Sequence, residues 1–109
     1  MPLDRETILE ALKSVYDPEI PVDVVNLGLI YEVRAEAGQV YVKITTTAPG
    51  CPVANWIAAQ IKNVIRRLAE AELSRTGAPI PEIVVETVYD PPWDMSRVSE
   101  EGRRMLGWA

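Results

Sequence analysis

The chain contains no histidine. This absence excludes the Cys-His dyad and the Ser-His-Asp triad, the common arrangements that activate a nucleophile. It also removes imidazole from the metal ligands, so a zinc site built from cysteine and histidine cannot form. Cysteine is almost as scarce, because Cys51 is the only one. A single cysteine cannot form an internal disulfide, which agrees with a reducing compartment.

Long apolar runs and an excess of basic charge are also missing. No run approaches the ~20 residues that cross a bilayer, and the start "MPLDRETILEAL" lacks the basic, uninterrupted pattern of a signal peptide. The net charge is −5, with 16 acidic and 11 basic residues, which disfavours a nucleic-acid-binding surface. We therefore expect a cytoplasmic protein with neither membrane nor nucleic acid as partner. The length of 109 residues predicts one domain, over 1–109.

The hydrophobic spacing predicts an α+β fold. Asp4 is a suitable N-cap for the first helix, Gly38 for the turn of a hairpin, and Gly77 for the end of a long helix. The pattern predicts, in order, a helix over 5–15, strands over 29–36 and 40–46, a helix over 52–75, a strand over 82–90 and a short helix from residue 99. This α-β-β-α-β order, followed by a C-terminal tail, is typical of a two-layer sandwich with the helices on one face of a small sheet.

The lone cysteine lies in "TTTAPGCPVA", at the junction between a predicted strand and a predicted helix. Proline is favoured at the first helical position, so Pro52 places Cys51 at the N-cap. The free N–H groups and the dipole of the helix start would then favour the thiolate, and we expect a pKa below the ~8.5 of a free cysteine. The alternative is a partly buried thiol that packs as a small hydrophobic group.

The segment "YDPEIPVD" follows the first predicted helix and contains two carboxylates. Asp17 and Glu19 lie on either side of Pro18. They are either solvated side chains where the helix stops, or a pair of hard oxygen ligands that could also influence a nearby thiol.

The tail "VYDPPWDMSRVSEEGRRMLGW" offers a third junction, where Asp90 ends a predicted strand and Trp93 follows. One interpretation is a tail that folds back, with Trp93 and Trp108 as apolar anchors. The other is a surface for a partner, because exposed tryptophan is enriched at binding hot spots.

Three motifs in the same order, "DPEIPVDVVNLGLIYEV", "TTTAPGCPVA" and "VYDPPW…SEEGRR…LGW", resemble the SufT/PaaD-like family of metal–sulfur cluster biosynthesis proteins, and its SufT-like branch in particular. The resemblance implies a fold like the C-terminal NifU-type assembly domain, with helices on one face of a small, mainly antiparallel sheet. It also implies a role in the maturation of iron–sulfur proteins, with Cys51 as the reactive or cluster-contacting group.

The family's functional positions can be transferred residue by residue. Ala48 stands where many members have a hydroxyl residue, and Cys51 stands alone where NifU-type scaffolds have a Cys-x-x-Cys pair. The resemblance therefore implies transient handling of iron or a cluster and no stable cofactor in the monomer. A homodimer would bring two thiolates together. The matching positions are Cys51 as the thiol or metal ligand, Asp17, Glu19 and Thr47 as supporting residues, and Asp90 and Trp93 as partner-binding residues.

Three functions follow from these observations. The first is an assembly factor, not a turnover enzyme, that serves the iron–sulfur assembly machinery and client apoproteins. The second is a non-catalytic adaptor that docks a multiprotein complex, as expected for PaaD-like members of a ring-oxygenating system. The third, a thiol enzyme, is disfavoured because the chain has neither a histidine base nor a resolving cysteine.

Overall fold

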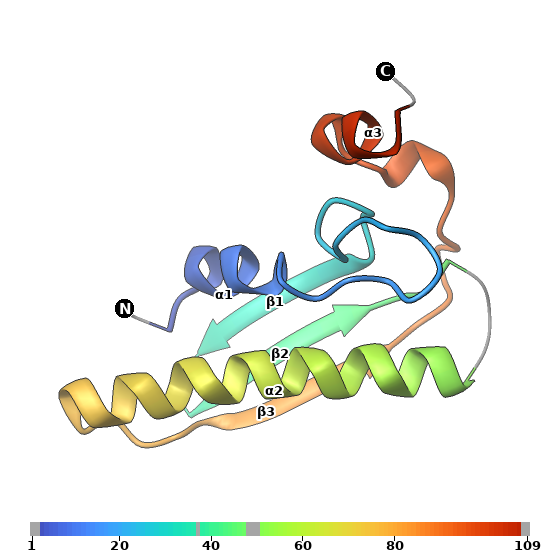
Figure 1. Cartoon of the computed structure of the whole chain (residues 1–109). Helices are drawn as coiled ribbons and strands as arrows, with labels where there is room; N and C mark the ends of the chain where they lie inside the picture. The colour runs from blue at the N-terminus through green and yellow to red at the C-terminus, as the bar shows by residue number, and fades with distance from the viewer. Residues whose placement is uncertain (1–2, 37, 48–50, 108–109) are drawn as a thin grey trace.

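The computed structural model describes residues 3–36, 38–47 and 51–107, with the backbone alone at 51 and 52. Figure 1 shows the predicted α-β-β-α-β order, followed by a tail with two further short helices. The elements are α1 (Arg5–Leu12), β1 (Ile30–Glu36), β2 (Gln39–Ile44), α2 (Cys51–Thr76), β3 (Glu82–Thr87), η1 (Met95–Arg97) and α3 (Glu100–Leu106).

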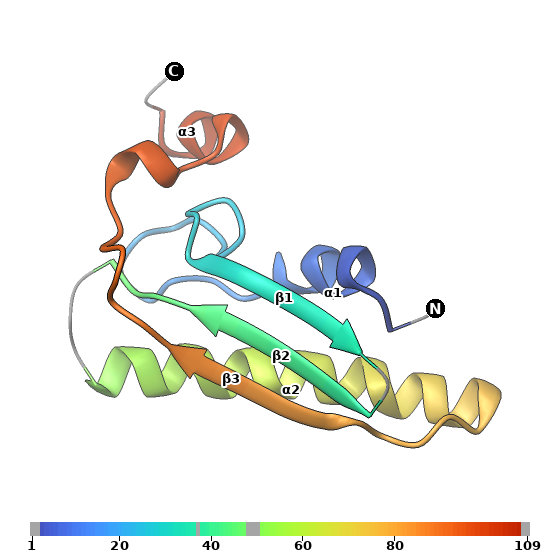
Figure 2. The same cartoon turned by 180° about the vertical axis from the view of Figure 1, so that it is seen from behind.

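The fold has two layers, and its class is α+β as predicted. Helices α1 and α2 cover the same face of a three-stranded sheet with the strand order β1-β2-β3 (Figures 1 and 2). The core lies between these layers, and its largest fully buried side chains come from both helices, from β2 and from the segment between α1 and β1. They include Ile8 and Leu12, Val40, Val42 and Ile44, Ile57, Ile61 and Ile65, and Leu27 and Leu29.

Strands β1 and β2 form the predicted antiparallel hairpin. The pairing runs from Glu36 opposite Gln39 to Ile30 opposite Ile44, and Gly38 has the positive φ, 82°, that the turn requires. The register shifts between Ile30 and Glu32, which leaves Tyr31 as the extra residue of a bulge.

Strand β3 pairs in parallel with β2, from Gln39 opposite Glu82 to Ile44 opposite Thr87. The sheet is therefore mixed, which differs from the mainly antiparallel sheet that the family resemblance implied. The cause is the length of α2: its 26 residues span about 39 Å, enough to carry the chain back along the whole sheet before β3 begins. Because of this crossover, β2 and β3 end at the same end of the sheet, where β1 and α2 begin (Figure 1).

Two element boundaries differ from the prediction by three residues, and the other boundaries differ by less. Helix α1 ends at Leu12, before Val15, because the next residues form tighter bonds to the carbonyl three positions back, as from Val15 N to Leu12 O. Val15 is nevertheless buried in the core. Strand β3 ends at Thr87, although Val88 N still donates to Ile44 O at 2.8 Å.

Helix α2 is amphipathic along its length. Ile57, Ile61 and Ile65 are fully buried against the sheet, whereas Lys62 and Arg66 are exposed on the opposite side. The N-cap prediction for α1 is also confirmed, because Asp4 Oδ1 accepts a hydrogen bond from Thr7 N at 2.8 Å. Within the described part of the chain, no helix combines the length and the apolar character needed to cross a membrane.

Candidate functional site

The predicted site positions gather at one end of the molecule. Thr47 follows the end of β2, Cys51 begins α2, and Asp90 follows the end of β3. Since β2 and β3 run in parallel and α2 begins where they end, the topology brings these three positions to the same edge (Figure 1). The sequence analysis treated the junction with Thr47 and Cys51 and the tail with Asp90 as separate, and the parallel crossover unites them.

The segment between α1 and β1 is joined to this same edge by backbone hydrogen bonds. Thr45 N donates to Leu29 O at 2.9 Å, Leu29 N to Val24 O at 3.0 Å, and Val24 N to Val15 O at 2.9 Å. These three hydrogen bonds link the backbone between Val15 and Leu29 to the residue that follows β2. They bring Asp17, two residues beyond Val15, to the end of the fold where β2 finishes.

Cys51 is the first residue of α2, one position later in the helix than the predicted N-cap. Its backbone nevertheless lies in the first turn, where N–H groups lack intrahelical partners and the helix dipole is positive. No acidic residue occupies that turn, so no like charge there opposes a thiolate. The side chain of Cys51 and the whole of Ala48 lie outside the described residues, and the expected thiol chemistry therefore stays a prediction.

Asp17 is buried, with 5 % of its surface exposed. Its Oδ1 accepts hydrogen bonds from Glu19 N at 2.8 Å and Ile20 N at 2.9 Å, which fixes the turn over 17–20. Its Oδ2 is also buried and has no hydrogen-bond partner among the described residues. A buried carboxylate oxygen without a partner is costly, which makes Oδ2 a candidate acceptor for a ligand.

Glu19 does not share this environment. Its side chain is exposed, and only its backbone N–H contacts the Asp17 carboxylate. Among the side chains that the structure describes, no three Cys, Asp or Glu residues gather closely enough to hold a metal ion. Asp17 and Glu19 thus lie near each other in the chain but do not belong to a larger described ligand cluster.

The threonines after β2 differ in burial. Thr47 is half-buried in a bend. Thr45 belongs to the predicted strand but follows the end of β2, where it is fully buried and its Oγ1 has no hydrogen-bond partner among the described residues. Strand β2 ends at Ile44, so the alternation of its side chains between the two faces of the sheet stops there. The backbone N–H of Thr45 instead bonds to Leu29 O, in the segment before β1.

The tail folds back on its own domain through Trp93. The indole Nε1 donates to Leu27 O at 2.6 Å, and the half-buried ring packs against the hydrophobic core. Asp90 is exposed at the start of the tail, and Trp108 lies outside the described residues. Trp93 therefore contacts its own domain. Partner binding by Asp90 and Trp93 stays a prediction.

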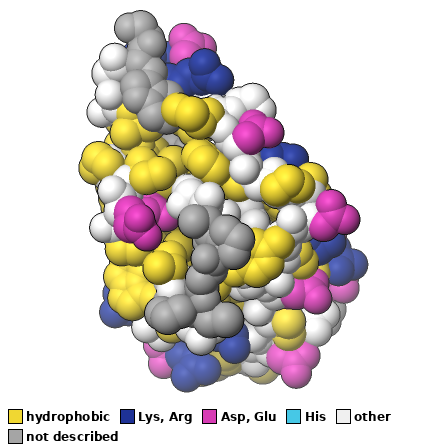
Figure 3. All heavy atoms as spheres, turned by 90° about the vertical axis from the view of Figure 1, so that its right-hand side faces the viewer, with side chains coloured by type: hydrophobic (Ala, Val, Ile, Leu, Met, Phe, Trp, Pro, Cys, Tyr) yellow, Lys and Arg dark blue, Asp and Glu magenta, His cyan; other side chains and the backbone are white. Residues whose placement is uncertain are grey.

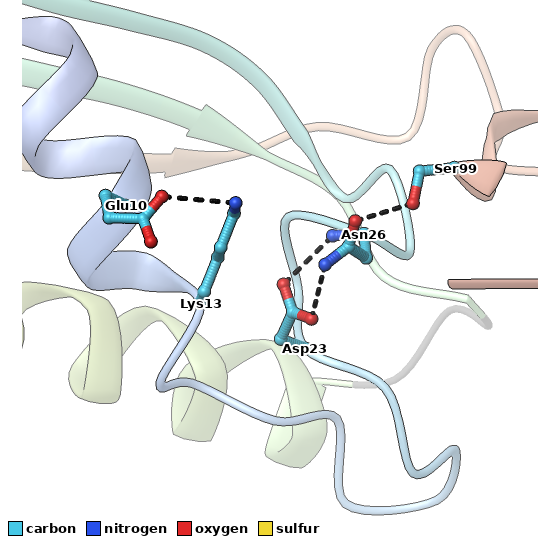
Figure 4. A network of polar contacts seen from close by, with 5 residues as sticks. All are labelled: Glu10, Lys13, Asp23, Asn26 and Ser99. Atoms are coloured by element: carbon cyan, nitrogen blue, oxygen red, sulfur yellow. Dashed lines mark hydrogen bonds and ion pairs between the residues drawn. The ribbon is translucent and has the colours of Figure 1, made fainter. Parts of the chain in front are cut away.

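A buried polar network also connects the tail to the segment before β1 (Figure 4). Asp23 accepts from Asn26 Nδ2 at 2.8 Å and from Asn26 N at 3.0 Å, and Ser99 Oγ donates to Asn26 Oδ1 at 2.6 Å. We call Asp23, Asn26 and Ser99 the tail latch. Ser99 also caps α3 by accepting from Gly102 N at 3.0 Å. The sequence predicted a helix after Ser99 but gave no sign of its partners, which are more than seventy positions away.

Close backbone packing accompanies the latch. A Cβ on Gly28 would lie 2.3 Å from Arg97 O, and one on Gly102 would lie 3.0 Å from Asn26 O. Only glycine permits these approaches, so the tail contacts the segment before β1 at backbone distance. The latch and these contacts hold the segment that carries Asp17.

Three exposed aromatic side chains were missed by the sequence analysis. Tyr16 precedes Asp17, Trp56 lies in the second turn of α2, and Tyr89 precedes Asp90; their exposed fractions are 47, 45 and 44 %. We call these residues the aromatic rim. Figure 3, which faces the end of the molecule where α2 begins, shows hydrophobic side chains gathered on this face. The sequence contained one sign of this surface, because Trp56 falls outside the buried stripe of α2. Exposed apolar side chains of this kind are typical of interaction sites.

Comparisons with known proteins agree with the motifs. Residues 5–73 match the family model described as iron-sulfur cluster assembly protein, a range that includes Asp17, Thr47 and Cys51 but not the tail. The Bacillus subtilis Fe-S protein maturation auxiliary factor YitW is 36 % identical over 94 % of this chain and 93 % of its own length. The Staphylococcus aureus maturation auxiliary factor SufT is 35 % identical over 85 % of this chain and 97 % of its own.

A solved structure supports the fold independently. The crystal structure of a domain of unknown function from Bacillus anthracis has a TM-score of 0.75 and 33 % identity, covering 95 % of this chain and 92 % of that one. The predicted family resemblance is thus confirmed by sequence and by fold. The chain belongs to the iron–sulfur cluster assembly protein family.

Proposed function

We propose that this protein is a maturation factor for iron–sulfur proteins that transiently takes up iron or a cluster at Cys51 and passes it to client apoproteins. The observation that carries the proposal is the position of Cys51 at the start of a 26-residue helix, at the same end of the fold as the buried Asp17. The names of the full-length relatives, which are maturation auxiliary factors, support this role. In this proposal the protein is a carrier and not a turnover enzyme.

The chemistry of the site suits a temporary cargo. A thiolate is the usual ligand of iron in iron–sulfur clusters, and the first turn of a helix favours the thiolate form of Cys51. Asp17 Oδ2 adds a buried carboxylate oxygen without a partner. Clusters are usually held by four cysteine ligands, whereas this chain has one cysteine. The remaining ligands would come from a second copy, the assembly machinery or the client, and such an incomplete set favours transfer over storage.

The aromatic rim supplies a surface on which a client or the assembly machinery could bind. Tyr16, Trp56 and Tyr89 expose nearly half of their surface and lie close in the chain to Asp17, Cys51 and Asp90. Burial of aromatic rings dominates the energy of many interfaces. A partner bound there would also exclude water from the cargo while it is transferred.

The test compares wild type with Cys51→Ser, because serine is accommodated well at a helix start and removes only the sulfur chemistry. Both proteins are reconstituted anaerobically with iron and sulfide, visible absorption is recorded, and maturation of a defined apo-client is followed by its activity. We expect the variant to lose the absorption band and most of the maturation. Equal maturation by both proteins would remove Cys51 from the mechanism.

The adaptor function remains a second candidate, and the exposed aromatic rim is the observation that favours it. In an adaptor, Trp56 would matter for docking and Cys51 would be dispensable. Trp56→Ala can be compared with Leu73→Ala, because both residues are exposed on α2, by 45 and 41 %, at opposite ends of the helix. Loss of client binding in Trp56→Ala alone, with full activity of Cys51→Ser, would favour the adaptor over the carrier.

A further inference from the structure

An open pocket of about 490 Å³ lies where the tail passes the beginning of β1. It is distinct from the described part of the predicted cargo site, since neither Asp17 nor Thr47 lines it. Its volume falls within the range of small-molecule sites. The lining residues are Gly28, Ile30, Tyr31, Glu32, Lys43, Pro91 and Arg97.

Arg97 is held in this pocket from two directions. Its backbone lies directly against Gly28, where an added Cβ would be 2.3 Å from Arg97 O. Its guanidinium carbon lies 4.7 Å from the centre of the Tyr31 ring, a cation–π distance. Tyr31 is in turn fixed, because it is the extra residue of the β1 bulge and its hydroxyl donates to Pro91 O at 2.7 Å.

The Arg97 guanidinium has no ion pair within the described part of the chain, although a carboxylate is close in sequence. The Asp94 carboxylate is instead engaged by Ser96, whose N donates to Asp94 Oδ1 at 2.8 Å and whose hydroxyl also donates to it. Arg34 offers a useful contrast, because it stacks on Tyr41 at 4.5 Å but is paired with Glu32 at 2.8 Å. Arg97 thus has the stacked geometry without an ion-paired carboxylate, although the charge of Asp94 is close enough to interact with it.

The charges around the pocket favour a ligand with one negative charge. Lys43 and Arg97 contribute two positive charges and Glu32 one negative charge, which leaves a net charge of +1 among the lining side chains. Lys43 Nζ lies 3.6 Å from Glu32, so part of its charge is already compensated. A phosphate dianion would face the Glu32 carboxylate with uncompensated charge, whereas a single carboxylate matches the planar donor pair of an arginine.

We propose that this pocket binds a carboxylate monoanion with a small apolar body, with Arg97 as the bidentate contact. Ile30 and Pro91 line the pocket and provide the apolar surface for that body. The carboxylate belongs either to a small organic acid or to an acidic side chain of another protein. Both sources present the same group to Arg97.

The test is a titration of the isotope-labelled full chain, followed by the NMR signals of Arg97 Nε–H and of Tyr31. The probes are hexanoate, its neutral counterpart hexanamide, inorganic phosphate, and a capped peptide with one internal glutamate between leucines. We expect saturable shifts with hexanoate, with the peptide or with both, and none with hexanamide. Binding of hexanoate identifies a free acid as sufficient, and binding of the peptide alone identifies a protein side chain.

Two arginine variants complete the design. Arg97→Gln should weaken binding by about tenfold or more, the usual effect of losing a charged hydrogen-bond partner. Arg104→Gln, the matched control, should change it by less than about twofold, since Arg104 is exposed, pairs with Glu100 and is not among the lining residues. Circular dichroism shows whether each variant is folded. The proposal is overturned if no probe binds at millimolar concentration, if hexanamide or phosphate binds as well as hexanoate, or if Arg97→Gln binds normally.

Discussion

Replacement of Gly28 by alanine would test whether the tail is held by backbone packing. The new Cβ would lie 2.3 Å from Arg97 O and 2.9 Å from Arg97 C, both of them backbone atoms that cannot rotate away. Gly28 also has a positive φ of 80°, which alanine adopts only with strain. Either the segment before β1 or the tail must therefore move.

The loss of stability expected for Gly28→Ala depends on the hydrogen bonds that this movement breaks. Three hydrogen bonds join the two segments near this contact, from Trp93 Nε1 to Leu27 O and from Ser99 N and Oγ to Asn26. Each is worth about 1 kcal/mol in net stability, and the left-handed backbone costs alanine about 1–2 kcal/mol more. We expect Gly28→Ala to lower the free energy of unfolding by about 3–5 kcal/mol, a large share of the ~5–15 kcal/mol of a typical domain.

Gly77→Ala is the matched control, since Gly77 has the same φ of 80° but nothing within 4 Å of the added Cβ. It should cost only the strain, about 1–2 kcal/mol. Urea unfolding followed by circular dichroism measures both losses, and trypsin should cleave the tail of Gly28→Ala first. Equal losses for the two variants, with equally resistant tails, would refute the role of this contact.

Two further predictions concern the caps of helices. Ser99→Ala removes both the α3 cap and the bond to Asn26, so it should lower the free energy of unfolding by about 1–3 kcal/mol in the same urea assay; an unchanged midpoint would show that the latch is not needed. Hydrogen bonds from Thr7 lower the pKa of Asp4 below its usual value of about 3.8. The unfolded chain therefore binds protons more readily, so the contribution of Asp4 to stability is present above pH 3.8 and is lost as the pH falls through the folded pKa. Asn caps about as well without titrating, so Asp4→Asn should match wild type near pH 6 and lose less stability than wild type by pH 3; parallel losses would contradict this assignment.

Local patterns in the sequence predicted most of the elements. Asp4 capped a helix, Gly38 turned a hairpin and Gly77 ended α2, because each of these features depends on residues within a few positions. The parallel pairing of β3 was not predictable in this way. The length of α2 was predicted almost correctly, but the edge of the sheet that β3 then joins depends on contacts between distant segments.

The site was predicted only in part. The sequence pointed to Asp17 but could not show that one of its oxygens is bonded and the other is buried without a partner. It could not place Thr45, whose burial depends on a bond to Leu29, or Trp93, whose indole reaches Leu27. All of these contacts join distant parts of the chain. The side-chain chemistry of Cys51 stays a prediction from its position at the helix start.

The mixed sheet has a consequence for the order of folding. The β1–β2 hairpin joins neighbouring segments, so it closes a short loop, whereas β3 can pair with β2 only after the chain has traversed the whole of α2. The tail follows β3 and must dock later still. We therefore expect hydrogen exchange to show slow opening of the hairpin and α2 and faster opening of β3 and the tail. If folding follows this order, the surfaces proposed for cargo and ligand are completed only in its last steps. A nascent chain could then bind neither the cargo nor the ligand.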